Sequence, residues 1–117
     1  MIRIRNKQYL NTLCTSHFIN LSSLLIAAKR GRTEIVQLLL TKGANVNDKN
    51  YKGETAMMEA AKKNRIELIE VLISNGGDVN AKNNRGISSI MMACHKGAFK
   101  ACKLLLFHGA NASDADR

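Results

Sequence analysis

Three glycines recur at a fixed interval along the chain, and this period constrains the fold more than any other feature of the sequence. Gly43, Gly76 and Gly109 lie 33 residues apart in turn, and Asn47 recurs at the same interval as Asn80. A fixed period of this length is typical of stacked repeats, in which each unit is one small supersecondary structure. We therefore expect three consecutive units in the 117 residues.

The middle unit predicts a pair of short helices. Thr55 is a favoured helix cap and precedes the first of them. Asn64 is expected to end that helix, in the place of Gly31 and Gly97 in the other units, because Asn tolerates left-handed backbone. Gly76 is expected to end the second helix in the same way. Spacings of three and four residues place the apolar side chains of the second helix on one face: Ile66, Ile69, Leu72 and Ile73.

The composition favours packed helices and a reducing environment. The chain is 45% hydrophobic and contains no Pro or Trp, and it has no apolar run near the roughly 20 residues that span a bilayer. Cys14, Cys94 and Cys102 are odd in number and lack CxxC spacing, so the sequence suggests neither a disulfide framework nor a zinc site. Cys94 and Cys102 are expected to be small core residues. We expect an intracellular, cytoplasmic setting, with the nucleus as the alternative.

These units resemble the ankyrin-repeat family, whose pattern runs as G-x-T-P-L-H-x-A-A, then G-H-x-E-I-V-x-x-L-L, then G-A-x-x-N. The chain reads SSLLIAAKRGRTEIVQLLLTKGANVN at 22–47, GETAMMEAAKKNRIELIEVLISNGGDVN at 53–80 and GISSIMMACHKGAFKACKLLLFHGANAS at 86–113. The period of 33 residues is also that of the family. The resemblance implies an all-α solenoid of helix-turn-helix units with projecting β-turn or hairpin loops.

The expected organisation is a basic segment at 1–17 followed by repeats at 18–49, 50–82 and 83–115. The basic segment is interpreted as a cap, an arm or a linker, and a targeting segment is the alternative. The last helix is apolar on several sides, which leaves two interpretations open: the chain is a fragment of a longer array, or a partner covers that face. The Pro and His of the family's T-P-L-H motif are missing from every unit, where Leu or Met would substitute packing for polar connection. This predicts marginal stability.

Ankyrin-repeat proteins bind partners mainly through their loop tips and the exposed face of their first helices, which line a concave groove. Carried over by position, the resemblance implies a groove formed by Lys29, Arg30, Tyr51, Lys52, Glu54, Lys62, Lys63, Arg85, Ile87, His95 and Lys96. Seven of these residues are Lys or Arg and one is Glu, so the groove should attract an acidic protein partner. Tyr51 and Arg85 are candidate anchors, because aromatic residues and Arg are frequent binding hot spots.

A basic nucleic-acid or anionic-surface binder is the alternative, because the formal net charge is +9. Neither a groove-reading motif nor a series of stacking aromatics is visible. An enzyme is not indicated, since Cys94 and His95 are neighbours on a helix and would point about 100° apart. The sequence shows no cofactor-binding phosphate loop, metal-ligand motif or small-molecule site.

The family resemblance also implies a modification. Loop asparagines of ankyrin repeats can be substrates of an asparaginyl hydroxylase, and Asn47 and Asn80 occupy the matching positions. Such a modification would make the chain a substrate without giving it catalytic activity.

Overall fold

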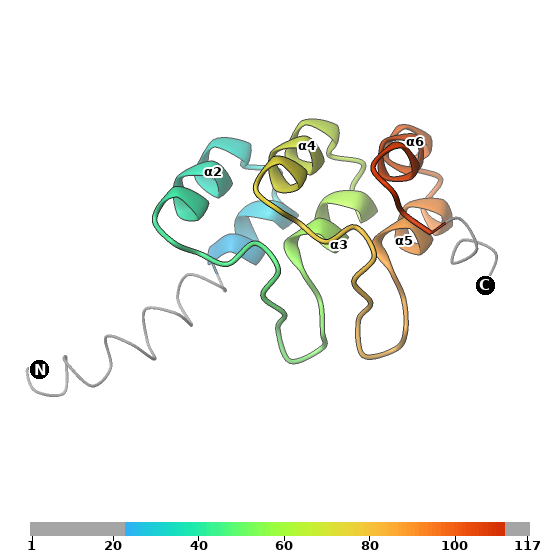
Figure 1. Ribbon diagram of the computed structural model, residues 1–117, viewed down its shortest axis with the longest axis horizontal. Helices are drawn as coiled ribbons and strands as arrows, with labels where there is room; N and C mark the ends of the chain where they lie inside the picture. The colour runs from blue at the N-terminus through green and yellow to red at the C-terminus, as the bar shows by residue number, and fades with distance from the viewer. Residues whose placement is uncertain (1–22, 112–117) are drawn as a thin grey trace, which may run out of the picture.

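A computed structural model describes residues 23–111, which form stacked pairs of short helices joined by projecting loops (Figure 1). Residues 23–29 are helical. They are followed by α2 (Thr33–Thr41), α3 (Ala56–Lys62), α4 (Ile66–Ser74), α5 (Ser89–His95) and α6 (Phe99–Phe107). The segment 1–17 and the outer ends of the first and third predicted repeats lie outside the described residues. No helix in the described part of the chain is long and apolar enough to cross a membrane.

The helices form two layers, as the predicted all-α solenoid requires. Figure 1 shows α2, α4 and α6 in one row, with residues 23–29, α3 and α5 in a second row beside the loops. Contacts run along each row, from α3 to α5 and from α2 through α4 to α6, and α3 packs on α4 and α5 on α6 within their units. The fold is therefore built from interfaces between neighbouring units as much as from interfaces within them.

The predicted helix ends are confirmed. The Thr55 side chain accepts a hydrogen bond from the Met58 N–H at 3.4 Å, and this caps α3. Ser88 caps α5 in the same way. Asn64 has a left-handed φ of 56°, and Gly76 has a φ of 87° just beyond α4. Side-chain caps and left-handed residues thus delimit helices of only seven to nine residues.

The core follows the predicted apolar pattern, with one addition. Ile69 and Leu72 are fully buried, and Ile66 and Ile73 pack against the core while half-buried. Leu68 is also fully buried, although the one-face pattern did not include it. The reason is that α4 contacts helices of both neighbouring units and therefore buries more than one stripe.

The two projecting loops are tied together by polar contacts, so the expected replacement of polar connection by packing is only half correct. Met58, in place of the family's His, is indeed fully buried. The Asn84 Nδ2 nevertheless donates to the Tyr51 carbonyl at 2.8 Å, and the Lys49 ammonium donates to the Lys82 carbonyl at 3.0 Å. Asparagine and lysine side chains thus join successive loops where the family uses His.

Gly53 allows these loops to approach closely. It has a φ of 79°, and a Cβ added there would lie 2.5 Å from the Asn84 Oδ1. A side chain at this position would therefore push the loops apart as well as strain the backbone.

The prediction that Cys94 is a small core residue is wrong, because the structure exposes it. Ala28 and Ala61 hold the equivalent position in the first two units and are fully buried. A further helix pair stacks on each of those units, whereas none follows the third unit within residues 23–111. Cys102 is half-buried, so it meets the expectation only in part.

Candidate functional site

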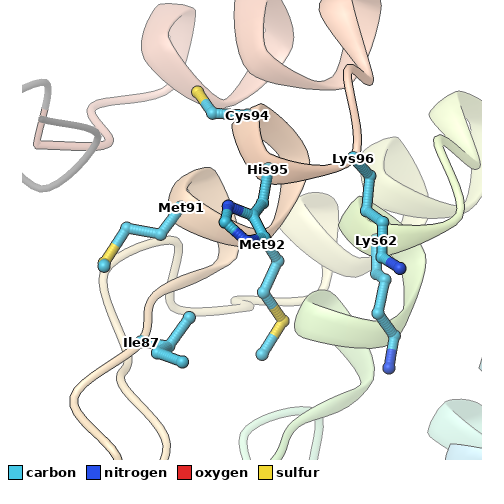
Figure 2. A pocket seen from close by; sticks show the side chains of 7 residues that line it. All are labelled: Lys62, Ile87, Met91, Met92, Cys94, His95 and Lys96. Atoms are coloured by element: carbon cyan, nitrogen blue, oxygen red, sulfur yellow. The ribbon is translucent and has the colours of Figure 1, made fainter. Parts of the chain in front are cut away.

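A groove of about 480 Å³ runs along α5 (Figure 2). It is lined by Lys62, Ile87, Met91, Met92, Cys94, His95 and Lys96. The side chains of Ile87, Met91 and Met92 are half-buried and supply its apolar walls. Unbranched Met side chains adapt to many shapes, which suits a surface that receives another chain.

Local structure fixes the walls of this groove. The Ser88 cap sets where α5 begins, and therefore which way Met91 and Met92 point. The Asn83 Oδ1 accepts the N–H of Ile87 at 3.0 Å, which holds the end of the loop against the helix. Lys62 comes from the last turn of α3, so two units contribute to the groove.

A second hollow, of about 420 Å³, adjoins the groove through two shared lysines. It is lined by Lys29, Glu59, Lys62, Lys63 and Lys96. These residues come from all three units, because basic side chains recur at the ends of the first helices. One position holds Lys29, Lys62 and His95, and the next holds Arg30, Lys63 and Lys96. The stacking of units turns this repeated pair of positions into a continuous basic surface, which we call the basic ladder.

Glu59 lies under the basic ladder and was missed by sequence reasoning. It is only 3% exposed, and its Oε1 lies 3.4 Å from the Lys62 Nζ. That Oε1 makes no hydrogen bond, so the contact with Lys62 is one of charge alone. The sequence does distinguish this position, because the equivalent residues in the other two units, Ile26 and Met92, are apolar. One buried carboxylate thus partly offsets a cluster of four lysines.

The predicted partner-binding residues fall into two groups. Six line the groove or the adjoining hollow: Lys29, Lys62, Lys63, Ile87, His95 and Lys96. The others lie outside both cavities: Arg30, Tyr51, Lys52, Glu54 and Arg85. Repeat position alone does not separate the groups, because Arg30 is equivalent to Lys63 and Lys96, which line the hollow.

The predicted loop residues outside the cavities are exposed, except for Glu54. Tyr51 is 85% exposed, and the Lys52 ammonium lies 5.7 Å from its ring centroid. Arg85 is also exposed. Glu54 is half-buried, and its carboxylate accepts a hydrogen bond from the Asn50 Nδ2 at 3.0 Å. Glu54 thus supports the shape of its own loop, whereas Tyr51 and Arg85 are presented to solvent.

Asn47 and Asn80 connect successive units. The Asn47 Nδ2 donates to the Gly76 carbonyl at 3.1 Å, and its Oδ1 accepts the Asp78 N–H at 2.7 Å. Asn80 makes the same two bonds to the Gly109 carbonyl and the Asn111 N–H. Both amides therefore have a structural role, and their hydroxylation stays a prediction.

The groove carries side chains suited to binding. Figure 2 shows Cys94 and His95 pointing in different directions from α5, as their adjacent positions predict. Within residues 23–111, no three His, Cys, Asp or Glu side chains are placed to hold a metal ion together. What the site offers is an apolar wall and several positive charges.

Comparison with known proteins supports the repeat assignment. The family described as "Ankyrin repeats (3 copies)" matches residues 5–83 and, in a second overlapping match, residues 24–116. A segment of 38 residues, 32% of the chain, is 55% identical to the E3 ubiquitin-protein ligase XBAT33 of Arabidopsis thaliana. A segment of 37 residues, also 32% of the chain, is 57% identical to the probable E3 ubiquitin-protein ligase XBOS33 of Oryza sativa subsp. japonica. Each match covers 7% of the relative's length.

Ankyrin-repeat domains are typically non-catalytic modules for protein–protein interaction. The 33-residue period, the stacked helix pairs and the family match over most of the sequence agree with one another. The chain belongs to the ankyrin-repeat family.

Proposed function

We propose that this chain is a protein-interaction module that holds an acidic segment of a partner protein along α3 and α5. The observation that carries the proposal is the groove itself. Its apolar wall of Ile87, Met91 and Met92 lies next to the ammonium groups of Lys62 and Lys96. A segment with one apolar side chain and neighbouring carboxylates would satisfy both features at once.

The basic ladder supports an acidic partner. One hollow is lined by four lysines: Lys29, Lys62, Lys63 and Lys96. The buried Glu59 is the only acidic residue among those that line it. Positive potential concentrated in a hollow raises the rate of encounter with a negatively charged partner. Packing of an apolar side chain against the methionines would then slow dissociation.

The loop tips supply candidate anchors outside the groove. Tyr51 and Arg85 belong to the residue types that dominate binding energy at protein interfaces. The hydrogen bond from Asn84 to the Tyr51 carbonyl ties the two loops together, which reduces the ordering that binding would require. We therefore propose that the partner extends from the groove onto the loop tips.

Binding to nucleic acid or an anionic surface is the second candidate. Four lysines in one hollow and a formal net charge of +9 favour it. Phosphate binding weakens steeply with salt, because counterions are released when phosphates are neutralised. A protein segment seated against Ile87 and the methionines would lose less affinity under the same change.

The proposal assigns the chain no catalytic role and places it inside the cell, in the cytoplasm or the nucleus. Support for the first part is the family, whose repeat domains are typically non-catalytic. Support for the second is that the three cysteines are odd in number and lack CxxC spacing, as fits a reducing compartment.

A peptide-library selection tests the proposed function with two variants of equal charge. The first replaces Lys62, Lys63 and Lys96 by Glu, and the second makes the same change at Lys42, Lys100 and Lys103. The control residues are exposed and lie on or next to α2 and α6, away from the groove. Circular dichroism first establishes that all three proteins are folded.

The native chain should enrich acidic peptides that contain an apolar residue. Their affinity should fall by at least about tenfold in the groove variant and by much less in the control variant, because the net charge changes equally in both. Equal losses in both variants would show that net charge, rather than the groove, governs binding. If duplex or single-stranded nucleic acid binds more tightly than any selected peptide at moderate salt, the second candidate replaces the first.

A further inference from the structure

The thiols of Cys94 and Cys102 meet between the two helices of the third unit. Their Sγ atoms are 3.1 Å apart, with Cys94 on α5 and Cys102 on α6. Both are free cysteines. Figure 2 shows that the Cys94 side chain points away from Met92 and His95. The pair thus lies at the edge of the groove, which Cys94 also lines.

The repeat register shows what the pair replaces. The equivalent residues are Ala28 and Val36 in the first unit and Ala61 and Ile69 in the second, all of them fully buried. The first two units thus have two apolar side chains at these positions, and the third unit has two thiols. There the first thiol is also exposed and the second is half-buried. Solvent access and close approach of two thiols therefore coincide at this pair.

We propose that Cys94 and Cys102 form a redox-reversible dithiol site, which peroxides oxidise to an intramolecular disulfide between α5 and α6. Cys94, the more exposed thiol, reacts first, and Cys102 resolves the product. Cys94 also lines the groove of the proposed function, but the test of the dithiol site requires no partner.

The chemistry balances with one molecule of hydrogen peroxide. The Cys94 thiolate attacks a peroxide oxygen, so an S–O bond forms, the O–O bond breaks, and one water leaves after protonation. Cys102 then attacks the sulfenic sulfur, an S–S bond forms, the S–O bond breaks, and the Cys102 proton leaves with the second water. The two sulfurs together lose two electrons, and the peroxide gains them. A small-molecule thiol reverses the reaction by exchange.

The environment of Cys102 supports the order of these steps. Burial, together with the hydrogen bond to Cys94 and the charge of that neighbour, raises the pKa of the Cys102 thiol to about 11. Cys102 thus keeps its proton at neutral pH while Cys94 meets solvent. The sulfurs need to approach by roughly 1 Å to reach the S–S bond length of about 2.05 Å. Side-chain rotation supplies a movement of that size without separating the helices.

The test uses the full chain with Cys14→Ser, so that the pair contains the only thiols. The protein is treated with a limiting amount of hydrogen peroxide and digested with trypsin under non-reducing conditions. Cleavage after the intervening lysines places Cys94 in the peptide 86–96 and Cys102 in the peptide 101–103. The expected product is the disulfide-linked pair of these peptides, lighter than the reduced pair by two hydrogen atoms and separated by a thiol reductant.

Two serine variants test the assignment of roles. In Cys102→Ser, the sulfenic acid at Cys94 should persist and react with dimedone at least about tenfold more than in the parent, because no neighbouring thiol consumes it. In Cys94→Ser, oxidation of Cys102 should be slower than oxidation of Cys94 in the first variant. Circular dichroism of both variants checks that the helices are retained.

Three results would overturn the proposal. One is a parent protein that forms mainly intermolecular disulfides at low protein concentration. Another is overoxidation of Cys94 to a sulfinic acid while Cys102 stays reduced. The third is equal dimedone labelling of Cys94 in the parent and in Cys102→Ser, since that would show that the two thiols do not react with each other.

Discussion

At the scale of single residues, Asn64 has two roles: it forms the turn between α3 and α4, and it caps a helix of the next unit. Its left-handed φ of 56° makes the turn between α3 and α4, as Gly31 and Gly97 do in the other units. Its Oδ1 also accepts the Ala101 N–H at 3.1 Å. That amide lies in the first turn of α6, whose own N-cap residue, Ala98, provides no side-chain bond. A turn residue in the second unit thus caps a helix of the third.

Substitutions at Asn64 separate these two roles. Asn64→Gly keeps the turn and loses the bond to α6, so the free energy of unfolding should fall by about 1 kcal/mol. Asn64→Ala also forces a Cβ into left-handed backbone, which should bring the total loss to about 2 kcal/mol. Urea unfolding measures both. An unchanged stability for Asn64→Gly would mean that the bond to Ala101 contributes nothing.

The Cys102 thiol predicts a loss of stability at alkaline pH. Its pKa is about 11 in the folded chain against an ordinary value of 9.0, because burial disfavours the thiolate. Well below pH 9.0 the thiol is protonated in both states, and its contribution to stability is complete. Between these values the unfolded chain releases the proton while the folded chain holds it, so stability falls as pH rises.

Thermal unfolding of the reduced protein measures this effect. The melting temperature of the native chain should fall more steeply from pH 9.0 to about 11 than that of Cys102→Ala, in which the lysines still titrate. Parallel pH profiles for the two proteins would show that Cys102 has the same pKa in the folded and unfolded chains.

At the scale of elements, asparagine side chains hold one loop to the next. Asn47 and Asn80 lie at equivalent positions, and each amide bridges from its own unit to the backbone beyond the following second helix. The loops themselves are shaped by Asn50 and Asn83, whose Oδ1 atoms each accept two nearby backbone N–H groups. The repeated Asn positions thus serve both turn formation and the stacking of units.

Asn47→Ala should lower the free energy of unfolding by about 2 kcal/mol, because two hydrogen bonds between units are lost. Asn45→Ala is the matched control, since the Asn45 side chain accepts a local bond from the Asn47 N–H and should cost less than half as much. Hydrogen exchange of the Asp78 amide should accelerate in Asn47→Ala and not in the control. Equal effects of the two substitutions would argue against bonding between units as the cause.

At the scale of the whole molecule, stability is shared between neighbours along the stack. The middle unit packs on both sides, since α4 contacts α2 and α6. The third unit has a neighbour on one side within residues 23–111, and its last helix leaves Phe99 and Phe107 70% and 83% exposed. A defect in the middle unit should therefore affect the array more widely than one in the third unit.

Substitution of two equivalent buried leucines tests whether neighbouring units share their stability. Leu72→Ala in α4 and Leu105→Ala in α6 remove the same atoms from fully buried sites, at a cost of about 2 to 5 kcal/mol for each substitution. Hydrogen exchange should show lost protection in all described helices for Leu72→Ala. For Leu105→Ala the loss should concentrate in α5 and α6, with α3 retained. Identical patterns for the two variants would indicate that the chain unfolds as a single cooperative unit.

Much of the fold could be predicted from the sequence, because its determinants are local and repeated. The left-handed turn at Asn64 and the caps at Thr55 and Ser88 depend on short-range geometry that residue type largely sets. The basic character of the candidate surface was also predictable, since Lys and Arg recur at fixed positions. For the same reason four residues of the groove, Lys62, Ile87, His95 and Lys96, were anticipated from their place in the repeat.

The tertiary structure decided what depends on contacts between units. It buried Glu59 beneath the basic ladder, and it made Met91 and Met92 groove walls, although residue type alone would place them in the core. It also exposed Cys94 and brought it to Cys102, where the equivalent residues of the other units are buried. The sequence by itself determined the repeating unit, because the unit's turns, caps and apolar spacing are local. Burial and side-chain proximity were decided by stacking, because each unit's environment depends on the neighbour packed against it.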